Sequence, residues 1–164
     1  MYLKVLAPVD QSDSYARGLL EAIWIAGTNK AQLRFLHIFN AARQGEPQQR
    51  PARWFDSLKF QGQELLDRSV RMAKAHGVGS EQVLVDCSGE SGSQAIIDYS
   101  RQWGADLIVM GSRGSPGSPA LDVCEQALGV LRMSEVPVLL VRGCARDYRL
   151  TDGDVSSNSL KGRA

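Results

Sequence analysis

The sequence lacks three features that would each assign a protein to a broad class at once. It contains no apolar run approaching the roughly 18 residues that a membrane-spanning helix requires. Its 19 lysine and arginine residues are balanced by 18 aspartate and glutamate residues, whereas a nucleic-acid binder normally carries a clustered basic excess. Its three cysteines are odd in number and form no CxxC pair, as expected in a reducing compartment. These absences argue against membrane and nucleic-acid partners and predict a cytoplasmic protein.

The C-terminal part of the chain has too little apolar material to join a folded core. Residues 145–164 carry four basic and three acidic residues, which leaves 15 of each over residues 1–144. Such a polar segment cannot offset its ordering entropy by burying apolar surface. The first residues show no basic stretch followed by a long apolar region, so no signal peptide is expected. We predict one domain over residues 1–144, followed by a flexible tail at 145–164.

Within residues 1–144, short apolar runs alternate with stretches of helical periodicity. The runs that we interpret as strands are residues 3–9, 33–39, 82–87, 106–110 and 136–141. The stretches that we interpret as helices are residues 15–26, 54–76, 93–103 and about 119–133. Strands that are apolar throughout are typical of sheets covered by helices on both faces, and strand–helix–strand connections favour parallel pairing. The pattern predicts an α/β fold with a five-stranded, mostly parallel sheet.

Polar residues and glycines follow three of the predicted strands. In parallel sheets, ligands bind beyond the carboxyl ends of the strands, where the strand order reverses. This rule points to Asp10, to the loop after Ile38 and to the glycines after Met110. Asp10 can accept hydrogen bonds from a ligand, but an aspartate at a strand end is also a turn former. Gly111 and Gly114 likewise fit either a ligand-binding loop or a tight turn.

Four segments of the chain, taken in order, resemble the universal stress protein family over about residues 2–142. They are Ala7-Pro8-Val9-Asp10-x-Ser12, Leu36-His37-Ile38, the run from Asp106 to Gly114, and the run from Val136 to Arg142. The resemblance implies a Rossmann-like (HUP-type) three-layer sandwich, and with it we expect the strand order 3-2-1-4-5.

The resemblance also implies a ligand site at these strand ends. Pro8 and Asp10 match family positions that contact an adenosine moiety, Ile38 matches a position that packs on the base, and Met110 ends the fourth strand. The candidate ligand-binding residues are Pro8, Val9, Asp10, Ile38, Met110, Gly111, Gly114, Cys124 and Glu125.

One part of this implied site departs from the family pattern. Family members that bind ATP carry G-x2-G-x9-G-[ST], in which glycines let backbone N–H groups approach phosphates at a helix start. Gly111 and Gly114 keep the first half, but Cys124 and Glu125 stand where Gly-Ser/Thr is expected. Glu125 supplies a carboxylate where an anion should bind, and residues 111–125 hold one basic against two acidic residues. We therefore expect no required cofactor, with ATP or another adenine nucleotide left open as a ligand.

These features favour a dimeric stress-response or regulatory module that works by binding other proteins, whose identity the sequence does not give. The alternative is a member of the family that binds ATP, ADP or AMP as a sensor or slow ATPase. A more distant reading is an adenylating enzyme, although residues 10–14 contain no glycine for a phosphate loop. His37 and His76 have no paired carboxylate motif or cysteine cluster, so we predict no catalytic residue and no metal site.

The last predicted strand, from Val136 to Val141, lies at the edge of the sheet in this order. An exposed apolar edge is a liability unless another strand or element covers it. Members of the family that the chain resembles commonly dimerise through this strand, and self-pairing about a two-fold axis would remove the edge. We expect a homodimer through this strand.

Overall fold

The computed structural model describes residues 1–10, 15–40, 52–87, 89–112 and 123–142. The predicted tail at 145–164 lies outside these ranges. In the described part of the chain, no helix combines the length and the apolar character that crossing a membrane requires.

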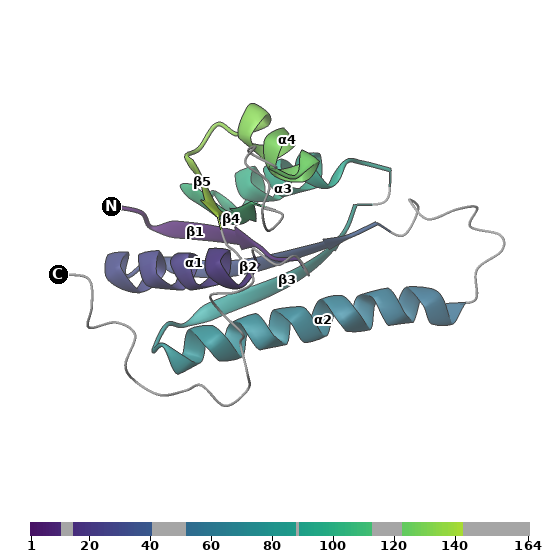
Figure 1. The fold of residues 1–164 in the computed structure, drawn as a ribbon, viewed down its shortest axis with the longest axis horizontal. Helices are drawn as coiled ribbons and strands as arrows, with labels where there is room; N and C mark the ends of the chain where they lie inside the picture. The colour runs from purple at the N-terminus through teal and green to yellow at the C-terminus, as the bar shows by residue number, and fades with distance from the viewer. Residues whose placement is uncertain (11–14, 41–51, 88, 113–122, 143–164) are drawn as a thin grey trace.

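The structure confirms the predicted α/β fold and its strand order. The elements are β1 (Lys4–Pro8), α1 (Tyr15–Asn29), β2 (Gln32–Phe39), α2 (Ala52–Ala75), β3 (Ser80–Asp86), α3 (Gly92–Trp103), β4 (Leu107–Ser112), α4 (Glu125–Met133) and β5 (Val138–Arg142). The five strands form one sheet in the order β3-β2-β1-β4-β5, and every neighbouring pair is parallel. Figure 1 shows α2 on one side of the sheet and α3 and α4 on the other.

Two apolar cores cover the two faces of the sheet. Val5 and Ala7 of β1 belong to the core shared with α1 and α2, whereas Leu6 between them belongs to the core shared with α3 and α4. All three side chains are at most 1% exposed. Because successive side chains of a strand point to opposite faces, a strand buried on both faces must be apolar at every position. This is why β1, β2 and β4 read as near-continuous apolar runs.

Several element ends differ from the predicted bounds. The fourth helix was expected from about residue 119, but α4 begins at Glu125, after the cap residue Cys124. The predicted fourth strand stopped at Met110, but β4 continues through Gly111 and Ser112, which pair with Val141 and Arg142 of β5. The prediction was wrong because glycine and serine favour a turn locally, whereas pairing with the neighbouring strand extends the ladder. The fifth strand begins at Val138, two residues later than predicted.

Helix α1 also runs further than its apolar periodicity indicates. Thr28 and Asn29 lie in its last turn, and their side chains donate hydrogen bonds to the carbonyls of Trp24 and Ile25 at 2.8 and 2.9 Å. These bonds give partners to carbonyls near the helix end. Lys30 then adopts a left-handed conformation with φ of 54°, which ends the helix.

The amino ends of three strands are tied to the end of α3 by stacked and charged groups. The guanidinium of Arg34 lies 4.4 Å from the ring centroid of Trp103 and donates hydrogen bonds to the Tyr99 hydroxyl and the Glu81 carboxylate. The Lys4 ammonium donates to the carbonyl of Trp103 at 3.0 Å. This cluster stabilises the sheet at the end opposite to the expected ligand site.

A single close backbone contact places the start of α1 against the end of β4. A Cβ atom added at Gly18 would lie 2.7 Å from the amide nitrogen of Gly111 and 3.2 Å from the carbonyl carbon of Met110. Real Cβ atoms essentially never approach a backbone atom so closely. Gly18 therefore lets α1 lie directly on the carboxyl end of β4.

We predict that Gly18→Ala lowers the free energy of unfolding by about 1–3 kcal/mol, because the added methyl forces backbone atoms apart. The helix propensity of alanine alone would act in the opposite direction, by about 1 kcal/mol. Urea unfolding measures the difference. Gly79→Ala is the matched control, since a Cβ at Gly79 meets no atom within 4 Å. Equal stability of the two variants would contradict the close contact.

Candidate functional site

A hollow lies at the carboxyl ends of β1, β2 and β4, where the strand order reverses between β1 and β4. The residues that line it are Pro8, Val9, Asp10, Tyr15, Ile38, Ile96, Met110, Gly111 and Gln126. Its volume is about 30 Å³, enough for about two waters by the measure on which one water needs roughly 10–15 Å³. A larger ligand would therefore keep part of its body outside the hollow.

The structure brings six of the predicted site residues together around this hollow. They are Pro8, Val9, Asp10, Ile38, Met110 and Gly111. Cys124 and Glu125 lie at the start of α4 and are not part of the lining, whereas the next residue, Gln126, is. Gly114 lies outside the described residues. The structure therefore groups the strand-end residues of the prediction and separates them from the Cys-Glu pair.

Three lining residues, Tyr15, Ile96 and Gln126, were missed by the sequence reasoning. Each belongs to a helix that reaches the hollow only through tertiary packing. Tyr15 is the first residue of α1, Ile96 lies on the buried side of α3, and Gln126 is the second residue of α4. The signal for Gln126 was its position directly after the Cys-Glu pair of the altered family pattern.

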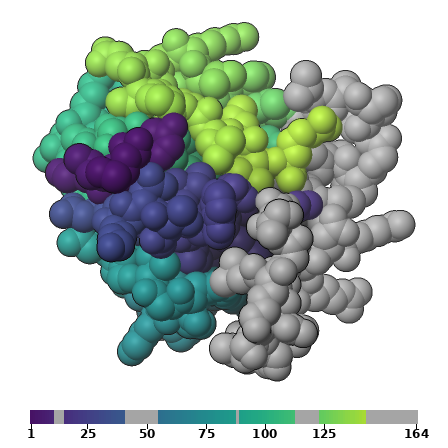
Figure 2. Space-filling model, turned by 90° about the vertical axis from the view of Figure 1, so that its left-hand side faces the viewer, coloured from purple at the N-terminus to yellow at the C-terminus, as the bar shows by residue number. Residues whose placement is uncertain are grey.

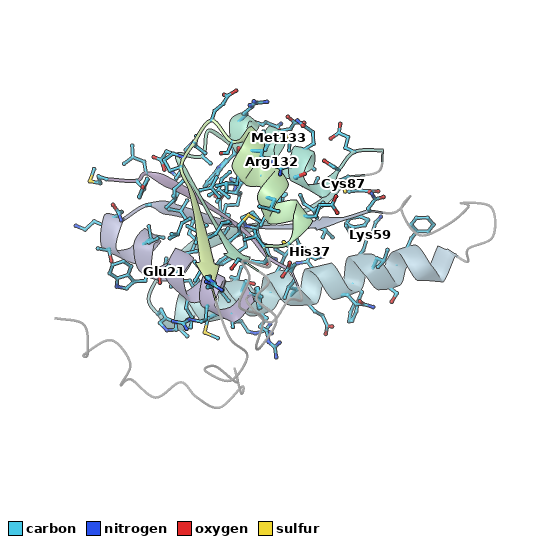
Figure 3. The ribbon with its side chains drawn as sticks, turned by 45° about the horizontal axis from the view of Figure 1, so that its top comes forward. Glu21, His37, Lys59, Cys87, Arg132 and Met133 are labelled. Carbon is cyan, nitrogen blue, oxygen red and sulfur yellow. The ribbon has the colours of Figure 1, made fainter. Side chains whose placement is uncertain are left out.

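His37 fixes the chain where it leaves β1 towards the hollow. Its Nδ1 lies 2.8 Å from the carbonyl oxygen of Val9, so Nδ1 carries the proton and donates it to that oxygen. The Val9 amide in turn donates to the carbonyl of Leu36 at 2.8 Å. The other side of the ring packs on α2, since a Cβ at Gly62 would lie 2.6 Å from His37 Cδ2. His37 (Figure 3) thus serves as a positioning residue for Val9.

Tyr15 turns its hydroxyl away from the hollow and into the contact between α1 and α2. The hydroxyl donates to Ser69 Oγ at 2.6 Å, because Ser69 uses its own proton to bond the Leu65 carbonyl at 2.8 Å. Burial raises the pKa of Tyr15, and the negative charge of Asp10 acts in the same direction. The hydrogen bond with Ser69 and the positive charge of Arg68 act in the opposite direction. The phenol is therefore held in its neutral form, and Tyr15 is one of the residues that line the hollow.

Comparison with known proteins now connects this fold to a family. The family model described as "Universal stress protein family" matches residues 1–142. The chain belongs to the universal stress protein family. Universal stress protein YxiE of Bacillus subtilis is 28% identical over 151 residues, which cover 87% of this chain and all of that protein.

Solved structures of the family have the same fold. A family protein from Burkholderia pseudomallei superposes with a TM-score of 0.71 at 24% identity, covering 85% of this chain and 96% of that one. A universal stress protein of Archaeoglobus fulgidus in complex with dAMP gives a TM-score of 0.64 at 20% identity, covering 85% and 97%. A universal stress protein in complex with cAMP gives 0.64 at 25% identity, with the same coverage.

In this universal stress protein, α4 begins with a cap that the chain supplies itself. Cys124 is the N-cap residue, and its Sγ accepts a hydrogen bond from the amide of Ala127 at 3.4 Å. Glu125 follows in the first turn with an exposed side chain. An acidic residue there is favourable by roughly 0.3–1 kcal/mol, because the amino end of a helix carries partial positive charge. A thiol and a carboxylate thus occupy the part of the helix that glycine and serine or threonine would leave open.

No group of three or more histidine, cysteine or acidic side chains within the described ranges is arranged to hold a metal ion. Cys87 is buried and Cys124 is half-buried, and the two form no disulfide with each other. Cys144 lies outside the described residues.

We predict that Tyr15→Phe lowers the free energy of unfolding by about 1 kcal/mol, the usual net value of a hydrogen bond. It should also remove a pH dependence. The raised pKa of Tyr15 means that its contribution is complete below the unfolded pKa of about 10 and is lost as pH rises through the folded pKa. Chemical unfolding from pH 8 to 11 measures both effects. Tyr2→Phe is the control, and an unaltered pH slope in Tyr15→Phe would refute the assignment.

Proposed function

We propose that this universal stress protein is a cytoplasmic, dimeric regulatory module that acts by binding other proteins and needs no ATP. The observation that carries the proposal is the start of α4, where Cys124 caps the helix and Glu125 places a carboxylate in its first turn. A helix start binds a phosphate through free N–H groups and partial positive charge. At the start of α4, the Ala127 N–H is bonded to the Cys124 thiol, and the partial positive charge of the helix start is balanced by the Glu125 carboxylate.

The described residues that line the hollow include no basic side chain that could balance the negative charge of a phosphate. None of the lining residues is lysine, arginine or histidine, and Asp10 is acidic. A triphosphate placed beside Asp10 and Glu125 would be repelled by like charges in a region that excludes part of the water. The electrostatics therefore support a function that does not depend on ATP.

The dimer is supported by the position and exposure of β5. This strand is last in the sheet order, so one of its edges has no neighbour in the described sheet. Leu139 is 36% exposed, and Leu128 and Leu131, which share one face of α4, are also exposed. Figure 2 shows this C-terminal part of the sheet and helix at the surface in yellow-green. Pairing of two β5 edges about a two-fold axis would bury such apolar groups.

A second candidate function is the binding of an adenine ligand in the hollow. It is favoured by the grouping of Pro8, Asp10, Ile38 and Met110 around one apolar recess. The complexes of two universal stress proteins with dAMP and cAMP support the same candidate, because their fold is shared with this chain. Ligand binding of this kind would serve sensing rather than a reaction.

We expect isothermal titration with Mg²⁺ and ATP to show no micromolar affinity. The double variant that carries both Cys124→Gly and Glu125→Ser lacks the thiol cap and the carboxylate. It should bind ATP at least about fivefold more tightly, because about 1 kcal/mol of opposing interaction is removed at the helix start. Glu64→Ser, which removes an exposed acidic residue from α2, is the charge-matched control. Micromolar ATP affinity of the wild type would overturn the ATP-independent role.

For the dimer, we predict that Leu139→Lys gives a monomer in light scattering, since a charge would then face the paired edge. The substitution should be tolerated by the isolated fold because Leu139 is already exposed. Leu3→Lys is the control, since Leu3 is more exposed than Leu139 and precedes β1, a strand that has a neighbour on both sides. A dimeric mass for Leu139→Lys would place the interface elsewhere.

A further inference from the structure

The sheet has a second outer strand, β3, at the edge opposite to β5. Figure 1 shows β3 at the margin of the sheet beside α2. All seven of its residues, Ser80–Asp86, pair with β2 in a continuous register without a bulge. The strand contains no proline and no lysine, two of the devices by which natural proteins protect an outer strand from further pairing. Such a strand can accept another strand along its free side.

The backbone groups on that free side can be identified from one hydrogen bond. The amide of Cys87 donates to the carbonyl of Phe39 in β2 at 2.9 Å. Since successive residues of a strand turn their backbone groups alternately to either side, Gln82 and Leu84 turn theirs away from β2. These N–H and C=O groups make no hydrogen bond to any residue in the described ranges. Two donors and two acceptors in a row are the chemistry that recognises an extended chain.

The side chains on the α2 face of β3 place negative charge on both sides of an apolar residue. Gln82, Leu84 and Asp86 share this face, because side chains alternate along a strand. Gln82 Nε2 donates to the Asp67 carboxylate at 2.8 Å, and Gln63 Nε2 donates to it at 2.9 Å. These bonds lower the pKa of Asp67, so the carboxylate is charged at neutral pH. The exposed Asp86 follows at the other end of the row.

The opposite face of β3 is apolar over the same stretch. Val83 and Val85 pack against the core shared with α3 and α4, yet both remain half-buried. Helix α3 packs on β2 on this side of the sheet. Glu81, the remaining acidic residue of the strand, is paired with Arg34. An incoming strand would therefore meet valines on this face and carboxylates around Leu84 on the other.

We propose that the free side of β3 binds an extended segment of another protein, with lysine or arginine at positions i and i+4 around three apolar residues. The inference rests on the proposed function, in which the protein acts by binding other proteins, and it names one binding surface and the chemistry of its partner. The two basic residues would lie opposite Gln82 and Asp86, and the middle apolar residue would lie opposite Leu84.

A second copy of this chain is the poorer occupant of the same edge. Antiparallel self-pairing centred on Leu84 would set Asp86 of each copy opposite Gln82, whose side chain already holds Asp67. Like charges brought together across a strand pair are destabilising. Strand β5 carries no acidic residue, so self-pairing there meets no such repulsion. The two edges of the sheet thus differ in the partner that suits them.

The test is fluorescence polarisation of the full-length protein with a labelled synthetic peptide, in which two lysines flank three valines and threonines extend both ends. We expect micromolar binding, which falls at least about tenfold when glutamates replace the two lysines. A peptide of the same composition with adjacent lysines is the control for unspecific attraction, and it should also bind weakly.

A matched pair of variants locates the binding at β3. Gln82→Pro removes an outward N–H at a position where an outer strand tolerates proline, so it should weaken peptide binding at least about fivefold. Gln82→Ala removes the same side chain but keeps the N–H, and it should bind nearly as the wild type. Leu139→Lys, which alters the other edge, should leave peptide binding unchanged.

The outcomes separate this inference from the function on which it rests. Equal binding by Gln82→Pro and Gln82→Ala overturns the assignment to β3, and a loss of binding in Leu139→Lys overturns it by placing the peptide at β5. A wild type that does not bind the lysine peptide overturns the inference, whereas light scattering and ATP titration still test the dimer and the ATP-independent role. Assembly beyond a dimer at high protein concentration that Gln82→Pro abolishes would make a second copy the occupant and overturn the choice of partner.

One measurement needs no variant and keeps the inference testable if Gln82→Pro fails to fold, which its melting temperature shows. The lysine peptide can be N-methylated at both lysines and at the middle valine, so that it cannot donate hydrogen bonds to the outward carbonyls of β3. Its binding to the wild type should be at least about fivefold weaker. Equal binding of the methylated and unmethylated peptides overturns strand addition.

Discussion

The approach of α1 to β4 at Gly18 is the contact on which the geometry of the hollow depends. The helix backbone lies so close to Met110 and Gly111 that no side chain fits between them. The same contact brings Tyr15, one turn earlier in α1, beside the ends of β1 and β4. A wider separation would move this wall away from Asp10 and open the hollow to solvent. One small residue in a helix thus sets the distance between two parts of the site.

The parallel sheet supplies the second constraint. Because all neighbouring strands are parallel, the carboxyl ends of β1, β2 and β4 lie at one edge, and Asp10, Ile38 and Met110 arrive there together. The helices then close the sides, with α1 contributing Tyr15 and α4 contributing Gln126. The strands determine where the hollow is, and the helices determine its chemistry. This division explains why a family can keep its fold while members differ in what they bind.

The sequence predicted those features that arise from local pattern and from chain topology. Alternating apolar runs and helical periods were enough for the parallel α/β sheet, and the rule for strand ends was enough for Asp10 and for Gly111. The strand order and the place of Met110 came with the resemblance to the family. The hydrogen bond between Tyr15 and Ser69 joins residues 54 positions apart, and no local signal marks such a pair. The role of Gly18 was equally hidden, since a glycine inside a helix reads locally as a weak helix former. Resemblance to the family added the expected loop pattern, which marked residues 124 and 125 as unusual.

The start of α4 connects the stability of this protein to its proposed function. An N-cap side chain stabilises a helix by about 0.5–2 kcal/mol when it is serine, threonine, aspartate or asparagine, and a thiol is a weaker acceptor. Cys124 nevertheless gives the Ala127 amide a partner in the absence of any ligand. An amide bonded to a thiol is no longer free to bind a phosphate, so the stability of the empty protein and the affinity for phosphate compete for the same group. In a protein that acts through its surface, a helix that is complete without ligand keeps that surface constant whatever the nucleotide concentration. The exposed leucines of α4 lie on this same helix, so its self-sufficient cap supports a binding surface rather than a phosphate sensor.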